Sequence, residues 1–178
     1  YLHATGKTKK TRFTVETKGG LVSIDLQVDR HGDAAAATVE MGIATFKPDA
    51  LPCSLNVPEL IQQPIEAGGR SLIFTGVSVG NPHCVVFKPT GESWSREELL
   101  ALGPALEHHK LFPKRTNVQL VVPTGRNEVF ILIWERGAGE TQASGSSSCA
   151  AASAAVRLGL VKSPVTVKMP GGVLNIDV

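Results

Sequence analysis

The hydrophobic pattern is densest in residues 129–134, VFILIW, and in the run of small residues that follows them. The first stretch has the length and the β-branched and aromatic content of a strand, and it ends at Glu135 and Arg136 in a glycine-rich loop. Residues 146–158 are mainly Ala, Ser and Cys, and Gly159 then offers a left-handed stop, so this segment predicts a helix. Because small residues lie on nearly every side of it, we expect a slender, buried helix that strands can approach closely.

The start of this helix is a candidate anion site. The first backbone N–H groups of a helix lack internal partners and carry the positive end of its dipole. Gly145, Ser146 and Ser147 would offer such donors to a phosphate or a carboxylate. Serines also cap their own helices, so the spacing alone predicts a capped helix start equally well.

Strands are predicted on both sides of these two elements, from alternating or apolar runs bounded by turn residues. They are residues 12–17 and 21–28, joined across 18–20; 34–40; 71–79 and 84–87, joined by the polar loop 80–83; 118–122, turned back at 124–127; and 165–169 and 173–178, joined across 170–172. Residues 42–58 contain glycine and several prolines, which interrupt regular secondary structure, so a domain boundary is expected there.

A second helix is predicted after residue 95. Ser95 and Glu98 have the spacing of a capping box. The apolar residues that follow recur at helical intervals: Leu99, Leu102 and Leu106. We expect this helix to cover the sheet, with residues 107–110 as its solvated end. His108 and His109 would point to different faces of a helix, which makes a poor metal pair, so no metal site is predicted.

The loop 80–83 holds two polar side chains between strands. Pro82 lacks an N–H donor and biases Asn81 toward an extended conformation, so Asn81 and His83 would be held at a fixed angle. Taken alone, this loop is more typical of an Asx-type turn with an exposed histidine.

Composition narrows the class of protein. The chain has 178 residues, of which 42% are hydrophobic and 19% charged, which is enough for one good core or two small ones. A net charge of +2 is too small to argue for nucleic acid. No apolar run approaches the about 20 residues that span a bilayer, and no secretory signal opens the chain, so a cytoplasmic protein is expected.

Cysteine usage and the two ends of the chain add further expectations. Three cysteines without a Cys-x-x-Cys pair argue against a disulfide framework and a zinc site, and they are expected to be reduced thiols. The sequence begins without methionine and stops inside an expected strand, so both ends are expected to be cut.

Three polar motifs now combine into a resemblance to the diaminopimelate epimerase family. They are Gly80-Asn81-Pro82-His83; Phe112-Pro113 with Thr116-Asn117-Val118; and Glu135-Arg136-Gly137-Ala138-Gly139-Glu140-Thr141 through Cys149-Ala150. They occur in the family's order, and Pro170-Gly171-Gly172 resembles its late hairpin. The resemblance implies an α+β fold, in which a mixed or antiparallel β-sheet is wrapped around a central small-residue helix. It also implies that residues 1–42 are the last strands of an incomplete first domain and that 43–178 are a nearly complete second domain.

The resemblance implies cofactor-independent inversion at an amino-acid α-carbon, in which one thiolate removes a proton and a thiol on the other face delivers one. Helix starts can tune a thiol pKa near 8.5, whereas a hydroxyl does not ionise usefully at neutral pH. The family's first cysteine, in Cys-Gly-Asn-Gly, would lie upstream of Tyr1. The second falls in Ala-Cys-Gly, which here reads Ala143-Ser144-Gly145. Cys149 lies five residues further along the helix and does not replace it.

Residue by residue, the resemblance implies one recognition site. Gly145 and Ser146 would hold the α-carboxylate by backbone N–H groups, and His83 would influence proton transfer. Ser144, His83 and Glu135 are thus the candidate catalytic positions. The residues expected at the distal amino and carboxyl groups are Asn81, Asn117, Glu135 and Arg136, and the arginine fork suits a carboxylate. Singly, Glu135 and Arg136 would be explained as a strand-end ion pair and Asn117 as a turn residue, but their joint occurrence favours the site.

The function this implies is that of an amino-acid epimerase or racemase, an isomerase of the diaminopimelate type that converts LL- to meso-diaminopimelate in lysine biosynthesis. This chain alone is expected to be inactive. The alternative is an inactive homologue that binds an amino acid or another carboxylate. A nucleotide site is disfavoured because no Gly-Lys-Ser/Thr follows the glycines, and a serine hydrolase because Gly-x-Ser-x-Gly is incomplete. The expected partner is a small amino acid, without cofactor, nucleic acid or membrane, and a homodimer is left open.

Overall fold

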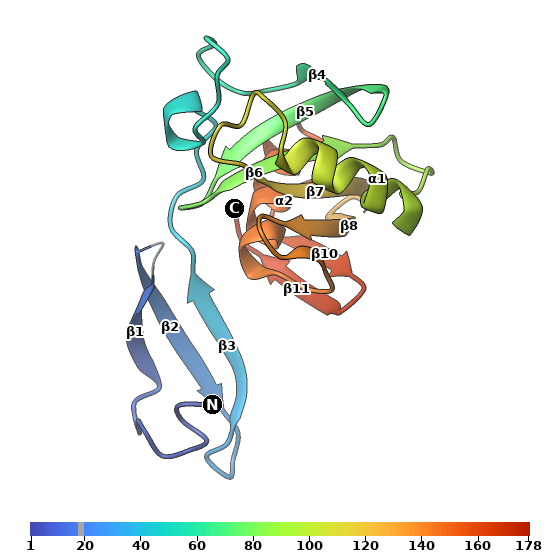
Figure 1. Cartoon of the computed structure of the whole chain (residues 1–178). Helices are drawn as coiled ribbons and strands as arrows, with labels where there is room; N and C mark the ends of the chain where they lie inside the picture. The colour runs from blue at the N-terminus through green and yellow to red at the C-terminus, as the bar shows by residue number, and fades with distance from the viewer. Residues whose placement is uncertain (18–19) are drawn as a thin grey trace. The chain divides into compact units, whose positions relative to one another are not determined.

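The computed structural model describes residues 1–17 and 20–178, and they form two compact units, Tyr1–Ile43 and Ala44–Val178. The first unit is an antiparallel sheet of β1 (Arg12–Thr17), β2 (Gly20–Val28) and β3 (Ala34–Glu40), in that order (Figure 1). Phe13 pairs with Ile24 and Leu26 with Ala37, so the predicted meander is confirmed. Residues 18–19 of the predicted turn lie outside the described residues. Because every side chain of β3 is exposed, this sheet has little core of its own.

The second unit is built on an eight-stranded mixed sheet (Figure 1). Its strands are β4 (Gln63–Ala67), β5 (Arg70–Ser78), β6 (Pro82–Phe87), β7 (Asn117–Gly125), β8 (Glu128–Glu135), β9 (Gly139–Thr141), β10 (Val165–Met169) and β11 (Gly172–Ile176). The order is β11-β10-β8-β7-β6-β5-β4, with β9 paired to β8. The β6–β7 and β8–β10 pairs are parallel and the other pairs are antiparallel.

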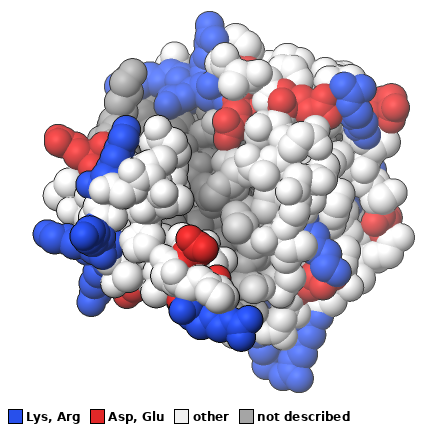
Figure 2. Space-filling model, turned by 90° about the horizontal axis from the view of Figure 1, so that it is seen from below, with Lys and Arg blue, Asp and Glu red and all other residues white. Residues whose placement is uncertain are grey.

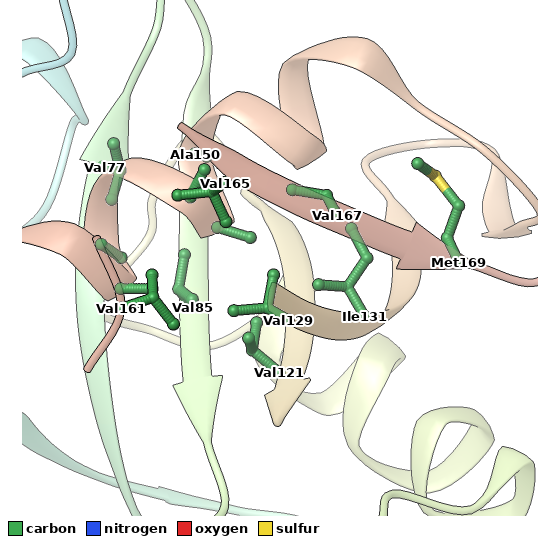
Figure 3. Packing of buried hydrophobic residues seen from close by; sticks show 14 of the residues in the cluster. Val77, Val85, Val121, Val129, Ile131, Ala150, Val161, Val165, Val167 and Met169 are labelled. Atoms are coloured by element: carbon green, nitrogen blue, oxygen red, sulfur yellow. The ribbon is translucent and has the colours of Figure 1, made fainter. Parts of the chain in front are cut away.

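The helix α2 (Gly145–Arg157) contacts β5, β6, β7, β8, β10 and β11, so the sheet wraps around it. Its alanines are fully buried, and they pack on valine and isoleucine side chains from the strands (Figure 3). The members of this core labelled there are Val77, Val85, Val121, Val129, Ile131, Ala150, Val161, Val165, Val167 and Met169. A helix with bulky side chains could not be enclosed this closely. The predicted α+β fold around a buried small-residue helix is confirmed.

The helix α1 (Arg96–Glu107) covers the other face of the sheet. Ser95 and Glu98 form both hydrogen bonds of the predicted capping box. The three leucines of its apolar stripe are buried: Leu99, Leu102 and Leu106. The prediction of a solvated end is wrong for Glu107, which is only 3% exposed because its carboxylate receives hydrogen bonds from Trp134 in β8 and from Gly137 just after it.

Three short elements were not predicted from the sequence: β4, β9 and a 3₁₀ turn, Pro48–Ala50. No helix within the described part of the chain has the length and apolar character to cross a membrane. On the face drawn in Figure 2, basic and acidic side chains lie in small separate groups with uncharged surface between them.

Candidate active site

Three strands of the second unit bring polar residues to one edge of the sheet. The parallel strands β6 and β7 both begin there, with His83 paired to Asn117. The antiparallel strand β8 ends there, since Trp134 pairs with Val118 and Glu135 follows it. The helix α2 also begins at this edge, because Asn81 contacts Ser146. The topology therefore gathers three polar loops around one helix start.

Ser144 is the N-cap of α2, with extended backbone angles of φ −156° and ψ 125°. Its Oγ accepts a hydrogen bond from the Ser147 backbone N–H at 3.4 Å. The capped helix start is thus present, and it uses one of the three predicted donors. In the described part of the chain, the Gly145 and Ser146 backbone N–H groups have no acceptor. Two amides at the positive end of the helix are left for an anion.

Asn81 joins the loop before β6 to the start of α2. Its Nδ2 donates to Ser146 Oγ at 3.5 Å, and its Oδ1 lies 2.8 Å from His83 Nε2. The amide plane is therefore held from both sides. Asn81 is half-buried, so its remaining N–H can reach a ligand.

His83 is fully buried, and the expectation of an exposed histidine is wrong. The ring points from β6 toward α2 on the same face as Val85, where solvent is excluded. The pKa of His83 is lowered to about 3, mainly by burial and also by the charge of Arg136, against an opposing effect of the neighbouring Gln119. The imidazole is therefore neutral at physiological pH.

Asn117 ties two loops together. Its Nδ2 donates to the Pro82 carbonyl at 2.8 Å, and its Oδ1 accepts from the Arg136 backbone N–H at 2.9 Å. It is the first residue of β7 and is 6% exposed, so the interpretation as an ordinary turn residue is wrong. Asn117 fixes the loop of Asn81 relative to the loop of Arg136.

Glu135 and Arg136 occupy the end of β8. The Arg136 side chain is exposed, and its Nη1 donates to the Lys114 carbonyl at 3.2 Å. Glu135 is half-buried, and its carbonyl accepts from Ala138 N–H in the turn that leads to β9. The alternative of an ion pair between these two side chains is wrong, because the structure forms none between them among its described residues.

Glu107 supports this loop from beneath and was missed in the sequence. Its Oε1 accepts from the Gly137 backbone N–H at 2.8 Å, and its Oε2 accepts from Trp134 Nε1 at 2.8 Å. Burial opposes ionisation, but these hydrogen bonds and the charges of His108 and Arg115 outweigh it, so the net effect lowers the pKa of Glu107. A signal was present, because Glu107 lies eight positions after Leu99, on the apolar stripe of α1.

Gln119 was also missed. It is fully buried on β7, and its Nε2 lies 3.0 Å from Ser147 Oγ on α2. Strand alternation places residues 117, 119 and 121 on one face, so a polar residue between Asn117 and the buried Val121 is the signal that could have found it.

An open pocket of about 300 Å³ lies beside Ser144 and Gly145. The turn and second strand of the β10–β11 hairpin form its other wall, and Gly171 N–H bonds to the Gln142 carbonyl at 2.8 Å to hold that wall in place. Pockets of this size accept small molecules. The start of α2 therefore opens on a space large enough for an amino acid.

The three cysteines are free thiols, as predicted. Burial raises the pKa of Cys84 and of Cys149, and it raises that of Cys53 against two backbone hydrogen bonds. None of the three is among the residues that line the pocket at Ser144. A reactive thiolate is therefore not supplied by the native cysteines.

Solved structures define the class of this fold. A hydroxyproline epimerase from Agrobacterium vitis superposes with a TM-score of 0.67 at 15% identity, over 99% of this chain and 55% of that one. A phenazine biosynthesis protein from Bacillus anthracis superposes with a TM-score of 0.52 at 14% identity, over 98% of this chain and 62% of that one. At such identities the likeness establishes the fold, which this chain shares with an epimerase.

Sequence relatives identify the family. The family model described as diaminopimelate epimerase matches residues 75–178. Diaminopimelate epimerase from Methanothermobacter thermautotrophicus is 39% identical over 170 residues, covering 96% of this chain and 58% of that protein. The one from Leptospira biflexa is 35% identical over 178 residues, covering 99% and 62%. This chain belongs to the diaminopimelate epimerase family, and it spans about three fifths of the length of these relatives.

Proposed function

We propose that this chain forms one side of the active site of an amino-acid epimerase that interconverts LL- and meso-diaminopimelate, a step of lysine biosynthesis. One observation carries the proposal. A continuous series of contacts runs from Ser146 at the start of α2 through Asn81 to the residue after it, Pro82, and on through Asn117 to Arg136. This series supports the proposal because it links polar groups suited to an amino acid to the start of α2.

The α-carboxylate would bind at the Gly145 and Ser146 N–H groups. Charge develops there when the α-proton leaves, because the resulting carbanion delocalises into the carboxylate. Fixed amide dipoles at a helix start stabilise such charge without having to reorganise. No metal or organic cofactor is needed for this part of the chemistry.

The distal amino and carboxyl groups would be recognised by Asn81, Asn117, Glu135 and Arg136. A half-buried carboxylate at Glu135 suits an ammonium group, and the exposed guanidinium of Arg136 can turn from the Lys114 carbonyl to a carboxylate. Because its pKa is lowered to about 3, the His83 ring is a weak base, and we propose that it influences proton transfer at the site without carrying the proton itself.

Ser144 limits what this chain can do. A hydroxyl does not ionise usefully at neutral pH, and Ser144 Oγ already accepts the Ser147 N–H. This observation favours a second candidate function, an inactive homologue that still binds an amino acid or another carboxylate. Both candidates use the same recognition groups and differ only in proton transfer.

The wider assignment follows from the family. We propose that residues 1–42 are the last strands of the first epimerase domain and that 43–178 are most of the second domain. We also propose a cytoplasmic protein that takes an amino acid as its small-molecule partner, with a homodimer as the assembly to be tested.

Solvent deuterium exchange at the substrate α-carbon tests the function. The protein to use is a full-length version with both family domains, supplied with diaminopimelate in D₂O. We expect binding with little exchange in the version that carries Ser144 and faster exchange in Ser144→Cys. Ser144→Ala controls for loss of the hydroxyl, and Ser93→Cys, at an exposed position, controls for adding a thiol elsewhere. Binding without exchange in every variant would favour the inactive homologue, and absence of binding would refute the site.

A further inference from the structure

The face of the sheet that covers α2 contains a polar interruption. Residues 85 and 121 on this face are valines of the apolar core, whereas His83 and Gln119 beside them are polar and fully buried. Ser147, which contacts Gln119 from α2, is also fully buried. Burial of an amide and an imidazole is costly unless their polar atoms are hydrogen-bonded, so their partners matter.

Two atoms of this cluster, His83 Nδ1 and Gln119 Oε1, are buried without a partner. The two side chains lie on the same face of paired strands, since Val85 of β6 pairs with Gln119 of β7 and His83 is two residues before Val85. An interaction with Gln119 is also among the influences on the pKa of His83. A doubly protonated His83 ring could donate from Nε2 to Asn81 and from Nδ1 to Gln119. The ring is neutral, however, because burial and the positive charge of Arg136 both disfavour its protonated form. With a single ring proton, one of the amides must turn.

Turning the Gln119 amide by 180° satisfies the whole cluster, because its oxygen and nitrogen exchange places without a change of shape. Its Nε2 then donates to His83 Nδ1, and its Oε1 accepts from the Ser147 hydroxyl, whose Oγ is 3.0 Å from the amide. His83 Nε2–H donates to Asn81 Oδ1 at 2.8 Å. Turning Asn81 instead would leave the Ser147 hydroxyl proton without an acceptor among the described contacts.

We propose that Gln119 is a positioning residue that donates to His83 Nδ1, holds the ring in its Nε2–H tautomer and thereby fixes Asn81 with its NH₂ group toward the start of α2. The consequence for recognition rests on the proposed function. An NH₂ group at Asn81 is a donor and selects a carboxylate oxygen, whereas a turned Asn81 would offer an acceptor and select an ammonium group. Gln119 thus sets the sign of the group that is recognised at Asn81 without touching the substrate.

Nitrogen-15 NMR of the histidine rings in this chain tests the proposal directly. The signals of His83 are assigned as those lost in His83→Gln. We expect Nε2 to carry the proton and Nδ1 to have the shift of a hydrogen-bond acceptor, unchanged across the range of about pH 5 to 8 in which ordinary histidines titrate. A proton on Nδ1, alone or together with one on Nε2, would overturn the proposal.

Gln119→Glu reverses the expected result, because a carboxylate can only accept. The ring should then gain a proton on Nδ1, and the pKa of His83 should rise into the titrating range. Gln27→Glu, at an exposed position of β2, is the matched control and should leave the ring unchanged. A ring in Gln119→Glu that keeps the spectrum of the unmodified chain would also overturn the proposal, and if that variant does not fold, the tautomer of the unmodified chain decides.

This measurement is independent of turnover. A wrong tautomer with normal isotope exchange in the full-length protein would refute the role of Gln119 and leave the proposed function standing. The expected tautomer together with a full-length protein that shows neither exchange nor binding would refute the proposed function and leave the role of Gln119 standing. In an active full-length version, Gln119→Met should raise KM for the amino acid more than it lowers kcat, because the change disturbs recognition and leaves proton transfer in place.

Discussion

Replacing Glu107 by Gln is the most direct way to test how the loop after β8 is held. The two side chains have nearly the same shape, so the change creates no cavity. The carboxylate accepts from Trp134 Nε1 and from the Gly137 backbone N–H, both at 2.8 Å. An amide can accept from only one of them, and its NH₂ group must face the other donor.

The magnitude follows from these two bonds. A hydrogen bond to a charged group contributes about 1.5–3 kcal/mol, and one of the two is lost. The remaining bond becomes a neutral one worth about 1 kcal/mol, while the cost of burying the carboxylate is relieved. We therefore expect the free energy of unfolding to fall by about 2 kcal/mol. With a urea slope of about 2 kcal/mol/M, the unfolding midpoint moves down by about 1 M.

The effect should depend on pH. The pKa of Glu107 is lowered in the folded chain, so its carboxylate stabilises the fold above the unfolded pKa, which is near 4.3. This contribution is lost as pH falls through the folded pKa. The difference between the two proteins should accordingly be full at pH 7 and shrink in acid.

Urea unfolding followed by tryptophan fluorescence measures the change, because Trp134 is itself a partner of Glu107. Glu92→Gln, at an exposed position before α1, is the control and should change the free energy of unfolding by less than about 0.5 kcal/mol. If Glu107→Gln matched that control at pH 7, the reasoning that this carboxylate fixes the loop of Arg136 would be refuted.

Three further changes test other parts of the structure. Gly103→Ala would place a Cβ 2.6 Å from the Trp134 ring, so it should lower the free energy of unfolding by about 1–3 kcal/mol in the same urea assay. Ser144→Cys should add one thiol that reacts with a chromogenic disulfide faster than the three native cysteines, whose pKa values are raised by burial; equal rates would contradict an activated helix start. Arg136→Ala should weaken amino-acid binding to the full-length protein by about tenfold to a hundredfold in calorimetry, and unchanged affinity would remove it from the site.

The sequence alone was sufficient to predict an element where a short local motif specifies it. The capping box at Ser95, the small-residue run of α2 and the glycine stop at Gly159 each specify an element through nearest neighbours, and all three are found. The fold class followed from the family motifs, and the buried helix agreed with it. Pattern and resemblance therefore pointed to the same answer.

Burial of polar residues could not be read in the same way. His83 and Glu107 were expected to be exposed because polar side chains usually are, and both are buried. Asn81, the hydrogen-bond partner of His83, is only two residues away, whereas Glu107 is held inside by Trp134 and Gly137, which are distant in sequence. Those partners are 27 and 30 residues from Glu107, and Gln119 is 28 residues from Ser147. Such pairs depend on sheet order, which alternation within one strand does not encode. The short strands β4 and β9 were missed for the related reason that their pairing, more than their composition, makes them strands.

The contacts at the start of α2 assign substrate recognition and proton transfer, the two parts of the family's chemistry, to different side chains. Asn81 and Asn117 are held by His83, by a backbone carbonyl and by a backbone N–H, and none of these bonds involves the Ser144 side chain. Ser144 Oγ bonds only to its own helix among the described contacts. Replacing the oxygen by a sulfur therefore removes none of these three bonds directly, although Asn81 also donates to Ser146 in the helix turn that Ser144 caps. In the proposed function, recognition of an amino acid and proton transfer therefore depend on different residues, and Ser144→Cys is the change that should distinguish a binding protein from an epimerase.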